Sequence, residues 1–400
     1  MPELNRRIVA AFLMAVSAGF LLGGYECIRS AANTIFKAEF GADALVYAGI
    51  VGPISLIAIL FLYGKVLTRY GSRRTLFWSH IFCSAFVVFG YALLAADYRS
   101  VAFPLLIFRK LYVVILIEQL WSFINSTLDQ SEAKLCNGPI LGVASVGAIL
   151  GGYFVGQFAQ TIGTDAMIFV AGLSLVPAAF GADFAFRLAK EPKPLVAQTE
   201  VLALGEMKRS PILLGLLVLI VSTQVLSTAL ELNFQTYLQI EYPNPDDQTA
   251  YSGNFFGHVN AIAFAMQFLL APIILRFVRL QIIHVLIPSL HLIICIYAML
   301  SPSVYMIGMA LLIFKVTDYS VFRAAKEVLY IPLDFAARYR AKQVIDVFGY
   351  RGGEGFASAL VLGLRNLMPN AGGGVYSYLV MGSALVWLAV LKPVLSKPRD

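Results

Sequence analysis

Charged residues are scarce in this chain. Asp, Glu, Lys and Arg together make up 13% of its 400 residues, whereas a typical soluble domain contains about 25%. Hydrophobic residues make up 59% of the chain, and its mean hydropathy is +0.77. The composition therefore excludes an ordinary soluble domain and indicates a chain that lies largely within a lipid bilayer.

Cysteine and histidine are rare and dispersed. The chain contains Cys27, Cys83, Cys136 and Cys295, and His80, His258, His284 and His291. They include no Cys-x-x-Cys pair and no spacing typical of a disulfide framework or a zinc site. We therefore expect no disulfide, no metal site and no cofactor, and we expect these side chains to be structural.

Long apolar runs dominate the rest of the sequence. A hydrocarbon core about 30 Å thick needs about 20 apolar residues per helix. Twelve runs meet this requirement, at residues 8–32, 44–67, 75–96, 103–127, 138–160, 165–188, 211–238, 254–276, 281–300, 303–327, 345–366 and 374–392. The first run is too long for a signal peptide and lacks a cleavage site of small residues. Because the runs do not resemble the short alternating strands of a membrane barrel, the sequence predicts an all-α membrane protein with twelve transmembrane helices.

The basic residues are unevenly distributed between the predicted loops. The formal net charge is +7 and the pI is near 9.1. If both termini are cytoplasmic, twenty Lys and Arg lie in cytoplasmic segments, seven lie at membrane depth, and Lys37, Arg99 and Arg365 lie in outer segments. This asymmetry follows the positive-inside rule. The basic excess therefore indicates orientation, and we expect a bacterial inner-membrane protein with cytoplasmic termini and no nucleic-acid partner.

A hydrophilic segment divides the chain near its middle. It covers residues 189–210 and separates an N-terminal half of six runs (1–188) from a C-terminal half of six runs (211–400). One constant offset aligns three charged pairs across the halves: Glu26 with Glu231, Lys110 with Lys315, and Asp129 with Asp334. Two parallel six-helix halves are typical of the major facilitator superfamily.

The segment Gly64–Arg74 also resembles this superfamily. Its two glycines and terminal basic residues match the loop between the second and third facilitator helices, with Thr68 in place of the usual Asp. The sequence therefore resembles a major facilitator protein in a local motif as well as in its halves.

Charges inside the runs are concentrated in runs 1, 4, 7 and 10. A charge at the centre of a membrane helix costs about 3 kcal/mol on insertion scales, so such residues mark a path for a polar molecule. In the facilitator fold these four helices line the central cavity. We expect substrate-binding roles for Arg29, Asn33, Arg109, Lys110, Trp121, Asn125, Lys315, Tyr319, Arg323 and Lys326, and charge-balancing or coupling roles for Glu26, Glu118, Glu231, Asp318 and Glu327. The sequence leaves an alternative open, in which these charged residues only balance one another in structural ion pairs. The pairs would be Glu26 with Arg29, Lys315 with Asp318, and Arg323 with Glu327.

Two motifs resemble a particular family. The first is Trp121-x-Phe-x-Asn125, followed after six residues by Glu132-Ala-Lys134. The second is Lys326-Glu-x-x-Tyr-Ile-Pro-Leu333, followed by Lys342-x-x-Ile-Asp-Val347 and Arg351-x-Gly353. Both are similar to motifs of the nucleotide transporter family, the ATP/ADP translocases of intracellular bacteria and plastids. The resemblance implies a twelve-helix exchanger whose cavity binds phosphate groups with basic side chains.

The chain departs from this family at several cavity positions. Ala32, Gln235 and Glu354 stand where the family has Lys, and Asn33 stands where it has Asp. Polyphosphates are recognised through concentrated positive charge. We therefore expect a small phosphorylated, carboxylated or zwitterionic metabolite, or a less charged nucleotide relative, to bind more tightly than ATP.

The expected activity is secondary active transport by a monomer that works by alternating access. The chain contains no Gly-x-x-x-x-Gly-Lys-Ser/Thr loop, which is the motif that cradles nucleotide phosphates in many ATPases. Transport is therefore expected to depend on exchange or a proton gradient, and we do not expect an enzyme. Two alternatives remain open: a non-transporting receptor or scaffold with a facilitator fold, and a membrane-embedded enzyme that acts on lipids.

The predicted orientation can be tested by thiol labelling. Single cysteines introduced between residues 189 and 210 of a cysteine-free variant should react only with a membrane-permeant reagent, because the basic asymmetry places this segment in the cytoplasm. Labelling of these cysteines in intact cells by an impermeant reagent would contradict the predicted orientation.

Overall fold

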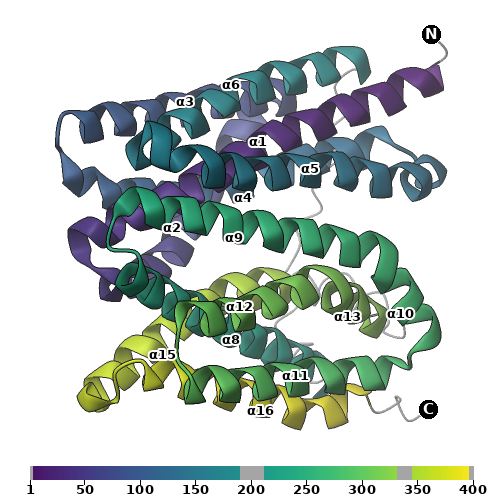
Figure 1. Ribbon diagram of the computed structural model, residues 1–400. Coiled ribbons are helices and arrows are strands. Elements are labelled where there is room, and N and C mark those ends of the chain that lie inside the picture. Colours follow the sequence, from purple (N-terminus) through teal and green to yellow (C-terminus); the bar gives the residue numbers. More distant parts are fainter. Residues whose placement is uncertain (1–2, 190–210, 331–344, 396–400) are drawn as a thin grey trace. The chain divides into compact units, whose positions relative to one another are not determined.

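The protein is described by a computed structural model, which covers residues 3–189, 211–330 and 345–395. In these ranges the backbone is almost entirely helical (Figure 1). Eleven helices in the described ranges are long and apolar enough to cross a membrane. The eleventh predicted run, 345–366, is not among these helices and forms a π-helical segment, η6 (Ile345–Gly352), followed by α15 (Gly353–Leu367). The predicted all-α class is confirmed.

The chain forms two compact units, and each is considered separately. Within the described residues, the first unit contains α1 (Glu3–Phe40), α2 (Leu45–Tyr70) from Ile54 onward, α3 (Ser72–Ala95), η2 (Arg99–Val101), α4 (Ala102–Thr127), α5 (Gln130–Ile162), α6 (Thr164–Ala189) and α9 (Pro245–Ala265) as far as Ala261. The predicted linker at 189–210 lies almost entirely outside the described residues, so the boundaries 1–188 and 211–400 remain predictions.

The second unit contains the remaining described segments. They are η1 (Ala42–Ala44), the start of α2 as far as Pro53, α8 (Pro211–Glu241), the end of α9, η3 (Met266–Leu270), α10 (Ala271–Phe277), α11 (Leu280–Leu300), α12 (Val304–Thr317), η4 (Asp318–Phe322), α13 (Arg323–Leu329), η6, α15, η7 (Pro369–Ala371) and α16 (Gly374–Leu395). Its helices pack mainly around α8, which contacts α12, α15 and α16.

Helix α1 is the centre of the first unit. It packs against α4, α5 and α6 (Figure 1), and its Ala11, Ala15 and Ala31 are almost completely buried. The sequence places the first span at 8–32, but α1 extends beyond both ends, because helices are not limited to the thickness of the hydrocarbon core.

Glycines bring α1 and α5 into close contact. A Cβ atom on Gly151 would lie 2.6 Å from Cα of Gly23, and one on Gly147 would lie 2.5 Å from Cα of Gly19. These separations are too short for a side chain of any size. Small residues spaced four apart let membrane helices approach closely, so the glycines fix the separation of these two helices.

A capping box begins α5. The Asp129 carboxylate accepts hydrogen bonds from the backbone N–H groups of Ser131 and Glu132, and Glu132 accepts one from the Asp129 N–H at 2.8 Å. Glu132 also lies 3.0 Å from an Arg7 nitrogen. The pKa of Asp129 is below its usual range, chiefly because the Glu132 backbone N–H donates to its carboxylate. The charged cap is therefore complete at neutral pH and is lost only as the pH falls through this lowered pKa.

The first part of α9 is fixed to the first unit by hydrogen bonds at its start. The Thr164 hydroxyl donates to Asp246 at 2.7 Å, and the Gln160 amide donates to Asp247 at 2.7 Å. Acidic residues in the first turn suit the positive end of the helix dipole. The sequence predicts a later start at residue 254, because hydropathy treats these polar residues as a loop.

The glycine contact predicts a selective loss of stability. Gly151→Ala should lower the free energy of unfolding by about 1–3 kcal/mol, the usual cost of overpacking. Gly382→Ala is the matched control, because a Cβ atom at Gly382 meets no heavy atom within 4 Å and alanine favours a helix. Thermal unfolding of both variants in the same detergent is the measurement. Equal melting temperatures for the two variants would contradict the close contact.

Candidate functional site

Four predicted site residues come together in the first unit. Glu26, Arg29 and Asn33 lie on α1, and Arg109 lies on α4. Arg29 pairs with Glu26 at 3.3 Å, while Arg109 donates to the Asn33 side chain and to the Arg29 carbonyl, each at 3.4 Å. We call these four residues the N-terminal cluster. Spacings of three and four residues along α1 place its three members on one face.

The N-terminal cluster is buried. The exposed fractions are 3% for Glu26, 5% for Asn33 and 3% for Arg109. Burial of charge is costly unless the charge is paired, which the Glu26–Arg29 contact achieves in part. Atoms Oε2 of Glu26 and Nε of Arg109 have no hydrogen-bond partner among the described residues. Since buried polar atoms are normally bonded, these atoms give the cluster spare capacity to hold a polar ligand.

Helix α9 adds two residues that the sequence analysis missed. The Asn260 amide donates to Glu26 Oε1 at 3.0 Å, and the Phe256 ring centroid lies 3.3 Å from the Arg29 guanidinium carbon. A cation over an aromatic face is attracted to it. Charge alone does not reveal these residues; the available signal was Asn260, an amide within a largely apolar run.

Lys37 is another residue that the sequence analysis did not include in the site, and its predicted location was wrong. The sequence analysis places it in an outer segment, but α1 continues to Phe40 and Lys37 is only 1% exposed. The spacing of Arg29, Asn33 and Lys37 by four residues was the signal, because it continues the polar face of α1 by one turn. Lys37 thus adds a buried amino group to the helix that carries most of the N-terminal cluster.

The remaining predicted residues of α4 are not part of these contacts. Lys110 and Trp121 are half-buried, whereas Glu118 and Asn125 are exposed in the first unit. Their proposed roles therefore rest on the sequence alone. The adjoining motif residue Glu132 has a structural role, because it completes the α5 capping box.

A second cluster lies in the second unit. Lys315 on α12 lies 3.1 Å from Glu231 on α8 and donates to the Ser227 hydroxyl at 3.1 Å. Asp318 is buried, and Arg323, Lys315 and Lys326 lie near it. We call Glu231, Lys315, Asp318, Tyr319 and Lys326 the C-terminal cluster.

Aromatic rings separate the cations of the C-terminal cluster. The Tyr319 ring centroid is 5.9 Å from the Lys315 nitrogen and 5.7 Å from the Arg323 guanidinium carbon. Lys326 is buried, lies 5.0 Å from the Tyr350 ring centroid, and is 3.5 Å from a Glu327 oxygen. The rings attract the cations and partly replace the water that they lose on burial. Arg323 and Glu327, by contrast, are exposed.

A π-helical turn lies in the middle of this cluster. Residues Asp318–Phe322 form η4 between α12 and α13. The sequence analysis assumes a uniform α-helix when it places Lys315, Asp318, Tyr319 and Lys326 on one face. A π turn inserts an extra residue and is often found at functional sites, so it changes the angle between the residues before and after it.

The positions where the resembled family has lysine add no positive charge to either cluster. Ala32 and Gln235 are buried and neutral, and Glu354 lies in the first turn of α15. Part of the second motif, 331–344, lies outside the described residues, including Asp334, Arg340 and Lys342. Within the described chain, no group of three His, Cys, Asp or Glu side chains is arranged to hold a metal ion.

Solved structures resemble this protein in fold. The crystal structure of a bacterial homologue of the iron transporter ferroportin, in its inward-facing state, aligns with a TM-score of 0.70 and 16% identity. The alignment covers 97% of this chain and 99% of that chain. Identity at this level shows the fold alone, and that fold is of the major facilitator type.

Curated relatives include two carriers from Chlamydia. The ADP,ATP carrier protein 1 of Chlamydia muridarum is 23% identical over 91% of this chain and 82% of its own length. The ADP,ATP carrier protein 1 of Chlamydia trachomatis is 28% identical over 44% of this chain. That alignment spans only 37% of the Chlamydia trachomatis protein.

A family model matches the C-terminal part of the chain. The model described as TLC ATP/ADP transporter matches residues 187–393, which are 207 of the 400 residues. This region contains the C-terminal cluster and the second sequence motif. A match over more than half of the chain shows that this membrane protein belongs to the TLC ATP/ADP transporter family.

Proposed function

We propose that this protein is a secondary active transporter for a small anionic or zwitterionic metabolite, which it moves by exchange or proton coupling. Its membership of a transporter family supports transport as the activity. The ion pair between Lys315 and Glu231, at 3.1 Å, is the observation that carries the choice of substrate. A cation already held by a carboxylate offers less attraction to a highly charged phosphate chain.

The formal charges of the two clusters support a substrate of low charge. The cations Arg29, Arg109, Lys315 and Lys326 are accompanied by the carboxylates Glu26, Glu231 and Asp318. The N-terminal cluster has two cations and one carboxylate, a formal net charge of +1, and the C-terminal cluster has two of each, a formal net charge of 0. Each cluster by itself suits a ligand with one or two negative charges, or a zwitterion, better than a nucleoside triphosphate.

The same ion pairs suggest how the substrate is coupled to conformational change. A membrane-embedded cation that loses its carboxylate partner needs another counter-charge, because an unpaired charge is costly there. An anionic substrate supplies that counter-charge to Lys315, and protonation of Glu231 then removes the competing carboxylate. In the proposed cycle, the loaded and empty carriers are both charge-balanced, and the intermediate with an unpaired cation is disfavoured.

The role of Glu231 can be tested directly. Glu231→Gln should slow transport at least about tenfold, equivalent to about 1.4 kcal/mol, because the amide cannot alternate between a charged and a neutral state. Uptake into vesicles that contain the purified protein is the measurement. Glu241→Gln is the matched control on the same helix, since Glu241 is an exposed residue at the end of α8. A wild-type transport rate in Glu231→Gln would show that Glu231 has only a structural role.

The substrate class can be tested by ligand-induced stabilisation. Small phosphorylated, carboxylated or zwitterionic metabolites should raise the melting temperature of the purified protein more than ATP does. A ligand at 100 times its dissociation constant adds about 2.7 kcal/mol of stability. The shift should disappear in Arg29→Gln and persist in Glu241→Gln. Strong stabilisation by ATP and ADP alone would overturn the charge argument and favour adenine-nucleotide exchange.

A further inference from the structure

An apolar groove lies between α2, α3 and α4 of the first unit. Its volume is about 630 Å³, and its lining includes Tyr63, Val66, Phe82, Phe108 and Ile115. All three helices are long and apolar enough to cross a membrane. A groove along such helices lies at the depth of lipid chains, where an apolar chain fills it more favourably than water does.

A smaller, polar cavity adjoins one end of this groove. It has a volume of about 400 Å³ and shares Tyr70, Arg74 and Trp78 with the groove. The turn between α2 and α3 lies here, so the cavity is at the end of two membrane helices. The apolar groove is therefore continuous with a basic cavity. A molecule with a hydrocarbon chain and a charged headgroup would fit such a combination.

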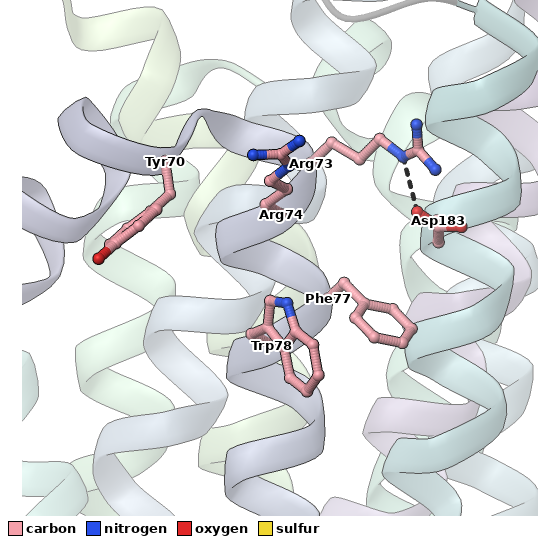
Figure 2. Close-up of a pocket in the computed structure, with 6 residues that line it drawn as sticks. All are labelled: Tyr70, Arg73, Arg74, Phe77, Trp78 and Asp183. Carbon is pink, nitrogen blue, oxygen red and sulfur yellow. Dashed lines mark hydrogen bonds and ion pairs between the residues drawn. The ribbon is translucent and has the colours of Figure 1, made fainter.

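The charges at the polar end favour an anion. Asp183 is engaged by two arginines, with Arg73 Nε at 2.6 Å and Arg187 Nε at 2.8 Å. Figure 2 shows the Arg73 side chain extended to Asp183, while the Arg74 guanidinium lies outside this pair. Arg74 is exposed and forms no ion pair with any other described residue. Three arginines against one carboxylate leave a formal charge of +2.

The start of α3 adds to this attraction. Its N-cap residue is Gly71, and no side chain caps the first backbone N–H groups. The N-terminus of a helix carries partial positive charge and unbonded donors, which favour phosphate. Arg73 and Arg74 belong to this first turn, so the backbone donors and the exposed Arg74 guanidinium lie on one short segment.

We propose that this groove binds an anionic phospholipid. One acyl chain lies along the groove between α2, α3 and α4, and the phosphate is held by Arg74 with the first turn of α3. The net positive charge selects an anionic headgroup over a zwitterionic one. This site is independent of the proposed substrate and of its transport.

Tryptophan fluorescence can report on the groove directly. Trp78 lines both cavities and is 64% exposed, and the chain contains only three tryptophans. A variant with Trp121→Phe and Trp387→Phe keeps Trp78 as the single reporter. Brominated phosphatidylglycerol should quench Trp78 more strongly than brominated phosphatidylcholine with the same acyl chains and at the same mole fraction.

The variants separate a specific site from general lipid contact. Arg74→Gln should weaken the preference for phosphatidylglycerol about fivefold, as expected for one cation near a membrane surface. Arg276→Gln is the matched control, because Arg276 is an exposed arginine at the end of α10. Val66→Phe should fill part of the groove and reduce the quenching of Trp78 by both lipids. Equal quenching by the two lipids, or an unchanged preference in Arg74→Gln, would overturn the proposal.

A second measurement guards against effects of the tryptophan replacements on folding. Native mass spectrometry of the unaltered protein should show phosphatidylglycerol retained in preference to phosphatidylcholine, and this preference should be weakened in Arg74→Gln by the same factor. Soluble glycerol phosphate should not displace the lipid. Displacement by glycerol phosphate would show a site for a free phosphate compound and would refute a lipid occupant.

Discussion

The need to balance charge in a medium without water governs this structure. Each cluster contains arginine or lysine beside a carboxylate, as in Arg29 with Glu26 and Lys315 with Glu231. Aromatic rings from Phe256, Tyr319 and Tyr350 lie against the cations. These pairings allow helices that contain charged residues to lie at membrane depth. They are also the basis for the proposed preference for a substrate of low charge.

The helices could be predicted because the bilayer imposes a simple rule on sequence. Backbone groups must bond within each segment, so long apolar runs become helices, and eleven such helices are found in the described chain. The ends were harder to predict. Helix α5 begins at Gln130 because Asp129 and Glu132 cap it, and α9 begins at Pro245 because acidic residues bond to Thr164 and Gln160. A hydropathy profile detects neither the capping of α5 nor the hydrogen bonds at the start of α9.

The candidate site was predictable where helical spacing alone determines contact. Glu26, Arg29 and Asn33 share a face of α1 as the spacing indicates, and the i,i+3 pair considered for Glu26 and Arg29 is present. Contacts between distant segments could not be obtained in this way. Asn260 and Phe256 reach α1 through tertiary packing, and Lys315 engages Glu231 from another helix. Lys37 was missed because the first helix was assumed to end at the hydrocarbon boundary.

The π turn Asp318–Phe322 affects how this chain is compared with its relatives. An α-helix advances about 100° per residue, so a single inserted residue rotates everything after it relative to everything before it. An alignment that simply counts residues from Lys315 will therefore be out of register at Lys326 against any relative whose helix lacks the turn. Equivalent positions on the two sides of η4 need separate anchors: Glu231 opposite Lys315 for the first part, and Tyr350 beside Lys326 for the second.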